Sequence, residues 1–231
     1  MKTIGLLGGM SWESTAEYYR LINQTVRDRL GPLHSARIAM ISLDFSEIEE
    51  LQHAGKWDEA GQILGDAAQA IERAGADFLV ICTNTMHKLA DDIQARIGIP
   101  ILHVADTLAA AVRTLGVHEV ALLATRFTME EPFYRERLET AHGMTVLVPA
   151  ETDRTIIHQV IFDELCAGRI EESSRAEFLR IANTLAGQGA EGIALACTEI
   201  GFLIKPGDLH IPVFDTAHIH AVAAVDLALA D

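Results

Sequence analysis

The sequence predicts an α/β protein with two pseudo-symmetric lobes, each a four-stranded, mostly parallel sheet flanked by helices. Three observations support this fold: short apolar runs alternate with longer amphipathic segments, four strand motifs occur twice in the same order, and small polar residues follow matched strands. Folds of this type bind ligands outside the carboxyl ends of their strands. We therefore expect the active site in the cleft between the lobes.

Eight short apolar runs account for the expected strands. They are Thr3–Gly8, Arg37–Ser42, Asp77–Cys82, Pro100–His103, Glu119–Ala124, Met144–Val148, Gly192–Cys197 and Ile211–Phe214. The segments between them are long enough for helices and show helical spacing of apolar residues. This regular alternation indicates βα units and a parallel sheet.

Two capping boxes mark expected helix starts. Ser14 and Glu17 form the first, at the start of a helix over Ser14–Leu30. Thr128 and Glu131 form the second, before Phe133–Ala141.

The internal repeat also fixes an alignment between the two lobes. Gly75-Ala76-Asp77 and Gly189-Ala190-Glu191 open matched strands, and Gly75 to Thr83 is eight residues, as is Gly189 to Cys197. Later motifs keep the order, since Ile99-Pro100 resembles Ile211-Pro212. We expect one lobe over residues 1–98 with a returning segment 207–231, and the other over 99–206.

The composition limits the partners that the chain can have. With 18 basic and 33 acidic residues the net charge is −15, which disfavours nucleic acid and anionic membranes. No apolar run approaches a membrane span, and the opening Ile4–Met10 run is followed by Trp12-Glu13, unlike a cleaved signal peptide. A cytoplasmic protein is expected, and a homodimer on base rates.

The three cysteines, Cys82, Cys166 and Cys197, form no C-x-x-C pair, so neither a zinc site nor a disulfide framework is indicated. His218-Ile219-His220 has no third metal ligand nearby in sequence. Gly5-x-x-Gly8-Gly9 is neither a dinucleotide fingerprint nor a Walker loop. We therefore predict no metal and no nucleotide.

Small polar residues follow the third strand of each expected lobe. The first lobe has Cys82-Thr83-Asn84-Thr85 and the second has Cys197-Thr198-Glu199. Hydroxyls, an amide and backbone N–H groups at a helix start suit a carboxylate ligand, although Thr and Asn are also common helix caps. Two such turns at matched places, each with a cysteine, favour a ligand site.

These motifs, with Gly5-Leu6-Leu7-Gly8-Gly9-Met10-Ser11 at the start, resemble the aspartate/glutamate racemase family over essentially the whole chain. The similarity is greatest to the enteric L-aspartate/glutamate-specific or broad-spectrum branch. The resemblance implies a two-lobed, cofactor-independent amino-acid racemase that uses no pyridoxal phosphate and no metal. It also implies two thiols beside the substrate Cα, one removing the proton and the other delivering one to the opposite face.

One position departs from that family pattern. The family motif is usually Cys-Asn-Thr, whereas here Thr83 precedes Asn84 and the cysteine is one place earlier, at Cys82. The eight-residue spacing in both lobes aligns Thr83 with Cys197. Because side chains alternate along a strand, Cys82 would then point into the sheet packing. We favour Thr83 and Cys197 as the catalytic pair and keep Cys82 as the alternative to Thr83.

The expected substrate-binding residues follow motif positions and strand ends. They are Met10, Ser11, Gln52, Asn84, Thr85, Thr125, Thr198 and Glu199. The resemblance implies an arginine near Gln52 and a lysine near Cys166, so both replacements weaken strict recognition of a carboxylate side chain. Glu199 would either orient or deprotonate Cys197, or favour the helix start.

Two alternatives stay open at this point. A related hydantoin racemase or a decarboxylase of malonate-like acids would share the strand-end cysteines. A non-catalytic amino-acid sensor would bind the ligand without turnover. All of these readings predict a small-molecule ligand, and an amino acid in the racemase and sensor cases.

Overall fold

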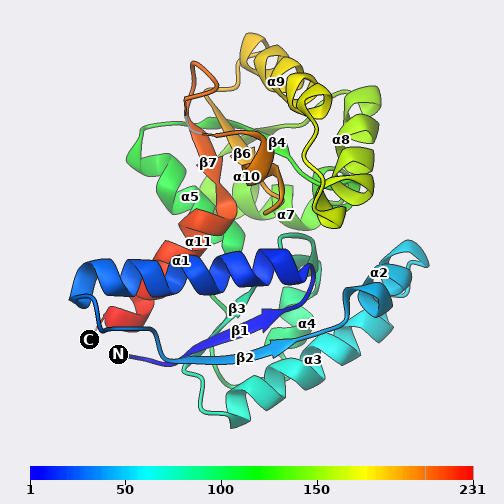
Figure 1. Ribbon diagram of the computed structural model, residues 1–231. Coiled ribbons are helices and arrows are strands. Elements are labelled where there is room, and N and C mark those ends of the chain that lie inside the picture. Colours follow the sequence, from blue (N-terminus) through cyan, green and yellow to red (C-terminus); the bar gives the residue numbers. More distant parts are fainter. Residues whose placement is uncertain (206, 231) are drawn as a thin grey trace. The chain divides into compact units, whose positions relative to one another are not determined.

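The computed structural model describes residues 1–205 and 207–230 and divides them into two compact α/β units (Figure 1). The first unit comprises residues 1–103 together with the described residues from 220 on, and the second comprises Val104–Ile219. Its first-unit elements are β1 (Ile4–Gly8), α1 (Trp12–Leu30), β2 (Ile38–Ser42), α2 (Phe45–His53), α3 (Trp57–Arg73), β3 (Phe78–Ile81), the 3-10 helix η1 (Thr85–Leu89) and α4 (Ala90–Gln94).

The second unit begins with α5 and contains most of the shorter helices. Its elements are α5 (Val104–Thr114), β4 (Glu119–Leu123), α6 (Arg126–Glu130), α7 (Pro132–Glu136), the π-helix η2 (Arg137–Ala141), β5 (Thr145–Leu147), α8 (Glu151–Asp163), the 3-10 helix η3 (Leu165–Ala167), α9 (Glu172–Gly187), β6 (Gly192–Leu195), α10 (Ile200–Leu203) and β7 (Val213–Asp215). Helix α11 (Thr216–Leu229) begins in the second unit and continues into the first.

The sheet of the first unit has three parallel strands in the order β2-β1-β3, which corrects the expected number of four. The expected fourth strand, Pro100–His103, makes a single bridge between Leu79 and Ile101. Pro100 has no N–H to donate to a ladder, and α5 begins immediately after His103. The segment therefore lies beside β3 without becoming a strand.

The sheet of the second unit has the expected four parallel strands, in the order β5-β4-β6-β7. Because β7 pairs with β6, the residues before His220 belong to this unit. The compact units divide at 103/104 and 219/220, whereas the sequence predicts approximate boundaries at 98/99 and 206/207. Residues 206 and 231, which fall within those expected ranges, lie outside the described residues.

Strands β1, β3 and β6 are buried along their whole length, and β4 is buried from Val120 on, as expected when helices cover both faces of a parallel sheet. In the first unit, α1 lies on one side of the sheet and α3 on the other (Figure 1). Leu7, Leu79 and Ile81 share a core with Leu64 of α3. The described helices include none long and apolar enough to cross a membrane.

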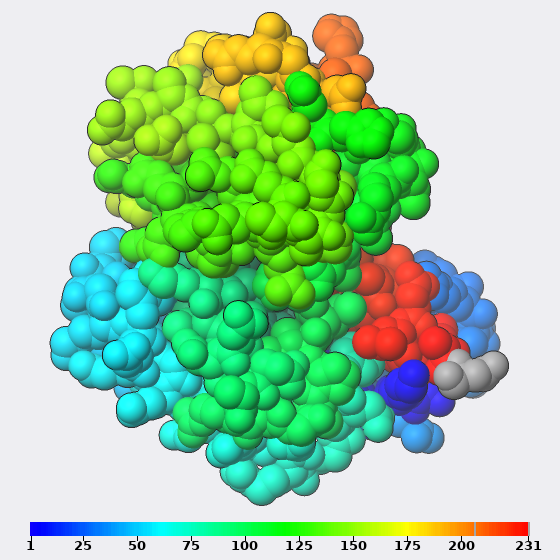
Figure 2. All heavy atoms as spheres, turned by 180° about the vertical axis from the view of Figure 1, so that it is seen from behind, coloured from blue at the N-terminus to red at the C-terminus, as the bar shows by residue number. Residues whose placement is uncertain are grey.

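The C-terminal helix completes the first unit beside the N-terminus, as Figure 2 shows from behind in red and blue. The Lys2 N–H donates to the Ala228 carbonyl at 2.8 Å, and Arg29 of α1 pairs with Asp226. Thus α11 provides the lobe with its returning segment, although that segment is shorter than expected.

Both expected capping boxes were wrong in the same way. Helix α1 begins at Trp12 with Ser11 as its N-cap, and α6 begins at Arg126 with Thr125 as its N-cap. Their oxygens accept hydrogen bonds from Ser14 N and Thr128 N. Each cap therefore lies three residues earlier than expected, shortly after the first strand of its unit, and it is a predicted substrate-binding residue.

Gly9 is the backbone position on which the first strand-end turn depends most. It has φ of 92°, and a Cβ there would lie 2.1 Å from the Leu43 carbonyl oxygen. We predict that Gly9→Ala lowers the free energy of unfolding by ~1–2 kcal/mol of backbone strain plus roughly 1–3 kcal/mol of overpacking. Gly75 is the matched control, with the same φ of 92° and open space around its Cβ position.

Urea unfolding of both variants measures the difference. Gly75→Ala should lose only the backbone strain, so equal losses for the two variants would contradict the steric account of the Gly9 turn.

Candidate functional site

In the first unit, the site residues follow the point where the β3 ladder ends. The Cys82 N–H donates to the Leu7 carbonyl at 2.9 Å, which is the last ladder bond before Thr83. Cys82 is fully buried, and its Sγ lies 3.9 Å from the Val80 carbonyl oxygen. Burial raises the pKa of the Cys82 thiol far above its ordinary value. Thr83, the next residue, is partly exposed.

The second unit ends its ladder in the same way. The Ala196 N–H donates to the Leu123 carbonyl at 2.8 Å, and Cys197 follows. Since Leu7 pairs with Ile81 and Leu123 pairs with Leu195, the two ladders correspond residue by residue. Cys82 is thus the counterpart of Ala196, and Thr83 is the counterpart of Cys197.

Cys197 is paired with a buried carboxylate. Its Sγ donates to Glu199 Oε2 at 3.1 Å, and the exposed fractions are 8% for Cys197 and 4% for Glu199. Burial raises the pKa of the Cys197 thiol, and the Glu199 charge and the nearby Cys166 thiol raise it further.

The remaining predicted site residues are divided between the two units. Ser11 and Thr125 occupy matched positions as the caps of α1 and α6. Asn84 and Thr85 are buried at the start of η1, and Thr198 is buried beside Cys197. Each strand-end turn therefore has partly or fully buried polar residues, and the same unit adds a helix cap after its first strand.

Two further predicted residues lie behind the first turn. Met10 and Met86 belong to one apolar cluster, and Gln52 of α2 points its Nε2 at Met86 Sδ, 3.8 Å away. Gln52 is buried, with 4% of its surface exposed. An uncharged amide thus stands where the family resemblance implies an arginine. Cys166 on η3 is half-buried.

Sequence analysis missed a cluster of buried side chains around Thr83. Ser14 Oγ donates to the Cys82 carbonyl at 2.9 Å, and His87 Nδ1 bonds the Thr83 carbonyl at 2.8 Å. The His87 ring lies 4.5 Å from that of His103 and 5.8 Å from that of His220, centroid to centroid. These residues come from separate elements, so spacing in the sequence could not reveal the cluster.

Two members of the histidine cluster, His87 and His220, have lowered pKa values. His220 Nε2 bonds the Leu102 carbonyl at 2.7 Å, and its Nδ1 bonds the Tyr18 hydroxyl at 2.9 Å. Burial lowers the pKa of His220 to about 4. Burial, together with His103 and His220, lowers the pKa of His87 well below its ordinary value. Among the described residues, no group of three or more His, Cys, Asp and Glu side chains is placed to hold a metal ion.

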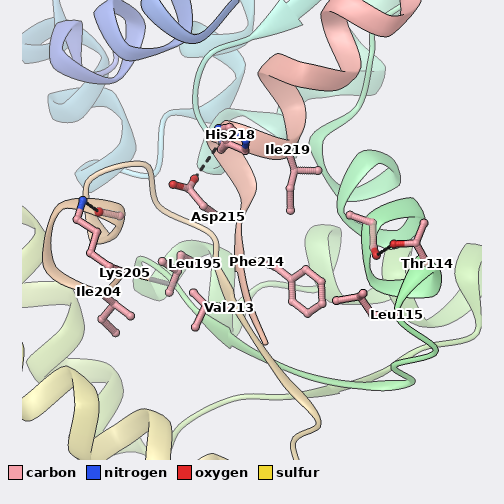
Figure 3. Close-up of a pocket in the computed structure, with 12 residues that line it drawn as sticks. Thr114, Leu115, Leu195, Ile204, Lys205, Val213, Phe214, Asp215, His218 and Ile219 are labelled. Atoms are coloured by element: carbon pink, nitrogen blue, oxygen red, sulfur yellow. Dashed lines mark hydrogen bonds between the residues drawn. The ribbon is translucent and has the colours of Figure 1, made fainter. Parts of the chain in front are cut away.

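A separate pocket of about 490 Å³ lies beside β7 in the second unit (Figure 3). Leu195, Val213 and Phe214 form its sheet side, Asp215 ends β7, and His218 lies in the first turn of α11. In Figure 3 Asp215 is turned toward His218, whose backbone N–H it accepts at 3.1 Å. None of the predicted site residues is among the described residues that line this pocket.

Comparison with known proteins identifies the family. The sequence model described as Asp/Glu/Hydantoin racemase matches residues 7–224. The chain belongs to the Asp/Glu/hydantoin racemase family. This membership confirms the recognised family, the α/β fold class and the racemase function expected from the sequence.

Individual relatives agree with this assignment. The chain is 51% identical to a candidate Asp/Glu racemase from Yersinia pestis over the whole of both chains, with a TM-score of 0.93. It is 34% identical to an aspartate racemase homologue from Pyrococcus horikoshii over 99% of each chain, with a TM-score of 0.86. A curated broad specificity amino-acid racemase from Bacillus subtilis is 22% identical over 98% of each chain.

The lowered imidazole pKa predicts how stability changes with pH. His220 is neutral when folded but has an ordinary pKa near 6.5 when unfolded, so its contribution is complete above pH ~6.5 and is lost as pH falls toward 4. Between pH 7.5 and 4.5, we predict that His220 alone lowers the free energy of unfolding by about 2–3 kcal/mol.

Chemical denaturation across this pH range measures the slope. His220→Gln should flatten it, and the exposed His34→Gln is the control that should leave it unchanged. An unaltered slope in His220→Gln would show that another group controls the acid sensitivity.

Proposed function

We propose that this racemase moves the Cα proton of an amino acid between Cys197 and Thr83, without a cofactor. The observation that carries the proposal is the matched strand-end register, which makes Thr83 the counterpart of Cys197 and Cys82 the counterpart of Ala196. Both residues must reach the same substrate carbon from opposite sides. The full burial and raised pKa of Cys82 also support Thr83 over Cys82.

Glu199 prepares the thiol for this reaction. The resting pair is a protonated thiol bonded to a carboxylate, since the pKa of Cys197 is raised. Transfer of the thiol proton to Glu199 gives the thiolate that removes the Cα proton of an L substrate. Thr83 then gives its hydroxyl proton to the other face, which yields the D enantiomer. The cycle closes when Glu199 releases its proton to solvent and Thr83 recovers one from solvent.

The turns around the two residues hold the substrate carboxylate in this proposal. Asn84, Thr85 and Thr198 supply amide, hydroxyl and backbone N–H donors, and Ser11 and Thr125 extend the set at the helix caps. Donors fixed around a carboxylate stabilise the carbanion-like state formed at Cα. Without them the weak acidity of the Cα proton would prevent its removal by a thiolate.

We infer a substrate range of aspartate, glutamate and other amino acids. Gln52 and Cys166 carry no positive charge. The part of the site that faces the substrate side chain therefore has no strong preference for a carboxylate in this proposal. The curated relative from Bacillus subtilis is itself described as having broad specificity. A cytoplasmic homodimer completes the proposal.

Solvent exchange at Cα tests the proposed pair. In D₂O, wild-type enzyme should exchange the α-proton of L substrate faster than it inverts the centre, because Thr83 is a weaker acid than Cys197. Cys197→Ala should lose both reactions by at least about a hundredfold. Thr83→Ala should keep exchange and lose inversion, and Thr83→Cys should raise inversion in both directions. Proton NMR and chiral chromatography follow the two processes.

Cys82→Ala is the control, and it should retain both exchange and inversion. A dead Cys82→Ala with an active Thr83→Ala would overturn the register argument. Binding of amino acids with no exchange at all would favour the non-catalytic sensor, and exchange confined to hydantoins or loss of CO₂ from a malonate would favour the related enzymes.

Removing the charge of Glu199 separates its two possible roles. Glu199→Gln should slow α-proton exchange by about a hundredfold or more because the thiol loses its base. The same change should speed alkylation of Cys197, because loss of the negative charge lowers the pKa of the thiol. Peptide mapping after iodoacetamide treatment distinguishes Cys197 from Cys166.

Glu171→Gln is the matched control, since Glu171 is exposed and makes no side-chain cap bond. Faster alkylation without slower exchange would mean that Glu199 only raises the pKa of the thiol.

A further inference from the structure

The backbone on both sides of Thr83 is held by side chains. Once the β3 ladder ends at the Cys82 N–H, the next two carbonyls lie beyond the paired residues of the described strands. Ser14 Oγ binds the first, on Cys82, at 2.9 Å, and His87 Nδ1 binds the second, on Thr83, at 2.8 Å. The peptide planes before and after Thr83 are therefore both fixed by buried donors.

The bond from His87 has a defined direction. A carbonyl oxygen can only accept, so His87 Nδ1 carries the proton and donates it. His220 is fixed in the other tautomer, because its Nε2 donates to the Leu102 carbonyl and its Nδ1 accepts from the Tyr18 hydroxyl. The His87 ring packs against this oriented ring and against His103.

The second strand-end turn does not have this imidazole. The residue four places after Thr83 is His87, whereas the residue four places after Cys197 is Gly201. A Cβ at Gly201 would come within 2.9 Å of Asp215 Oδ2, so a side chain there would have to displace the Asp215 carboxylate. The histidine is therefore a feature of the threonine half alone and is not required by the repeated fold.

We propose that His87 is a positioning residue for Thr83, which holds the Thr83 carbonyl so that the hydroxyl keeps one orientation toward the substrate. This inference rests on the proposed role of Thr83 as proton donor. A hydroxyl is a weaker acid than a thiol, so its proton transfer depends more strongly on a fixed approach to Cα, and a small misplacement is costly. The Cys197 step does not depend on His87.

The test compares three variants of His87. His87→Asn keeps a donor where Nδ1 stands, His87→Gln moves the donor to the place of Nε2, and His87→Leu removes it. We expect His87→Leu and His87→Gln to slow inversion of L substrate at least about tenfold, while α-proton exchange in D₂O stays near the wild-type rate. His87→Asn should restore most of the inversion.

A double-mutant cycle with Thr83 completes the experiment. In the Thr83→Ala background, His87→Leu should cause no further change in exchange or inversion, because the group that it positions is absent. Equal losses of exchange and inversion in His87→Gln, or failure of a folded His87→Asn to restore inversion, would overturn the proposal. If His87→Leu does not fold, the Asn and Gln pair decides alone.

Failure of the positioning role of His87 can be distinguished from failure of the proposed function. If exchange survives in Cys197→Ala, the two-residue mechanism itself is wrong. If exchange requires Cys197 but all three His87 variants invert substrate like wild type, only the positioning role is rejected.

Discussion

The proposed chemistry of this protein depends on where each parallel ladder stops. The Cys82 N–H bonded to Leu7 and the Ala196 N–H bonded to Leu123 are the last rungs, and the residue after each one leaves the sheet. Within a ladder, side chains alternate between two helix-covered faces, so a reactive group there is buried like Cys82. One residue later the backbone leaves the ladder. The position of the last ladder hydrogen bond therefore decides which residue is buried in the sheet, Cys82, and which is the candidate acid, Thr83.

Residues beyond the last ladder hydrogen bond need other contacts to hold their positions, and the two units supply different ones. In the second unit the contact is electrostatic, because a buried carboxylate accepts a hydrogen bond from the Cys197 thiol and raises its pKa. In the first unit it is structural: Ser14 and His87 bind the carbonyls around Thr83. A buried unpaired carbonyl would be costly, so these donors satisfy the turn as well as orient it. The repeated fold thus carries two unlike half-sites.

Local patterns predicted the repeat, the parallel strands and the alignment of Thr83 with Cys197, because burial on both faces leaves apolar runs of fixed length. They failed where tertiary contacts outweigh local preference. Ser14 resembled a helix cap, yet its hydroxyl binds Cys82 sixty-eight residues away, and Ser11 caps the helix. The Pro100 segment resembled its counterpart before β7 but remained a single bridge. The histidine cluster joins residues 87, 103 and 220, and no spacing rule connects them.

The unequal half-sites constrain the kinetics without changing the equilibrium. Two enantiomers of an amino acid have equal free energy, so kcat/KM must be the same in both directions whatever the acids are. A weak acid at Thr83 cannot make the enzyme one-way, because the same hydroxyl must act as the base for a D substrate. In the proposed mechanism, its weakness lowers both rates together and lengthens the life of the carbanion-like state beside Cys197. That longer life would let the thiol exchange its proton through Glu199, to which it is hydrogen-bonded, and return one to the original face. Under this proposal, an apparent preference for L substrates arises from exchange without inversion, and the donor that holds Thr83 in place sets how often inversion succeeds.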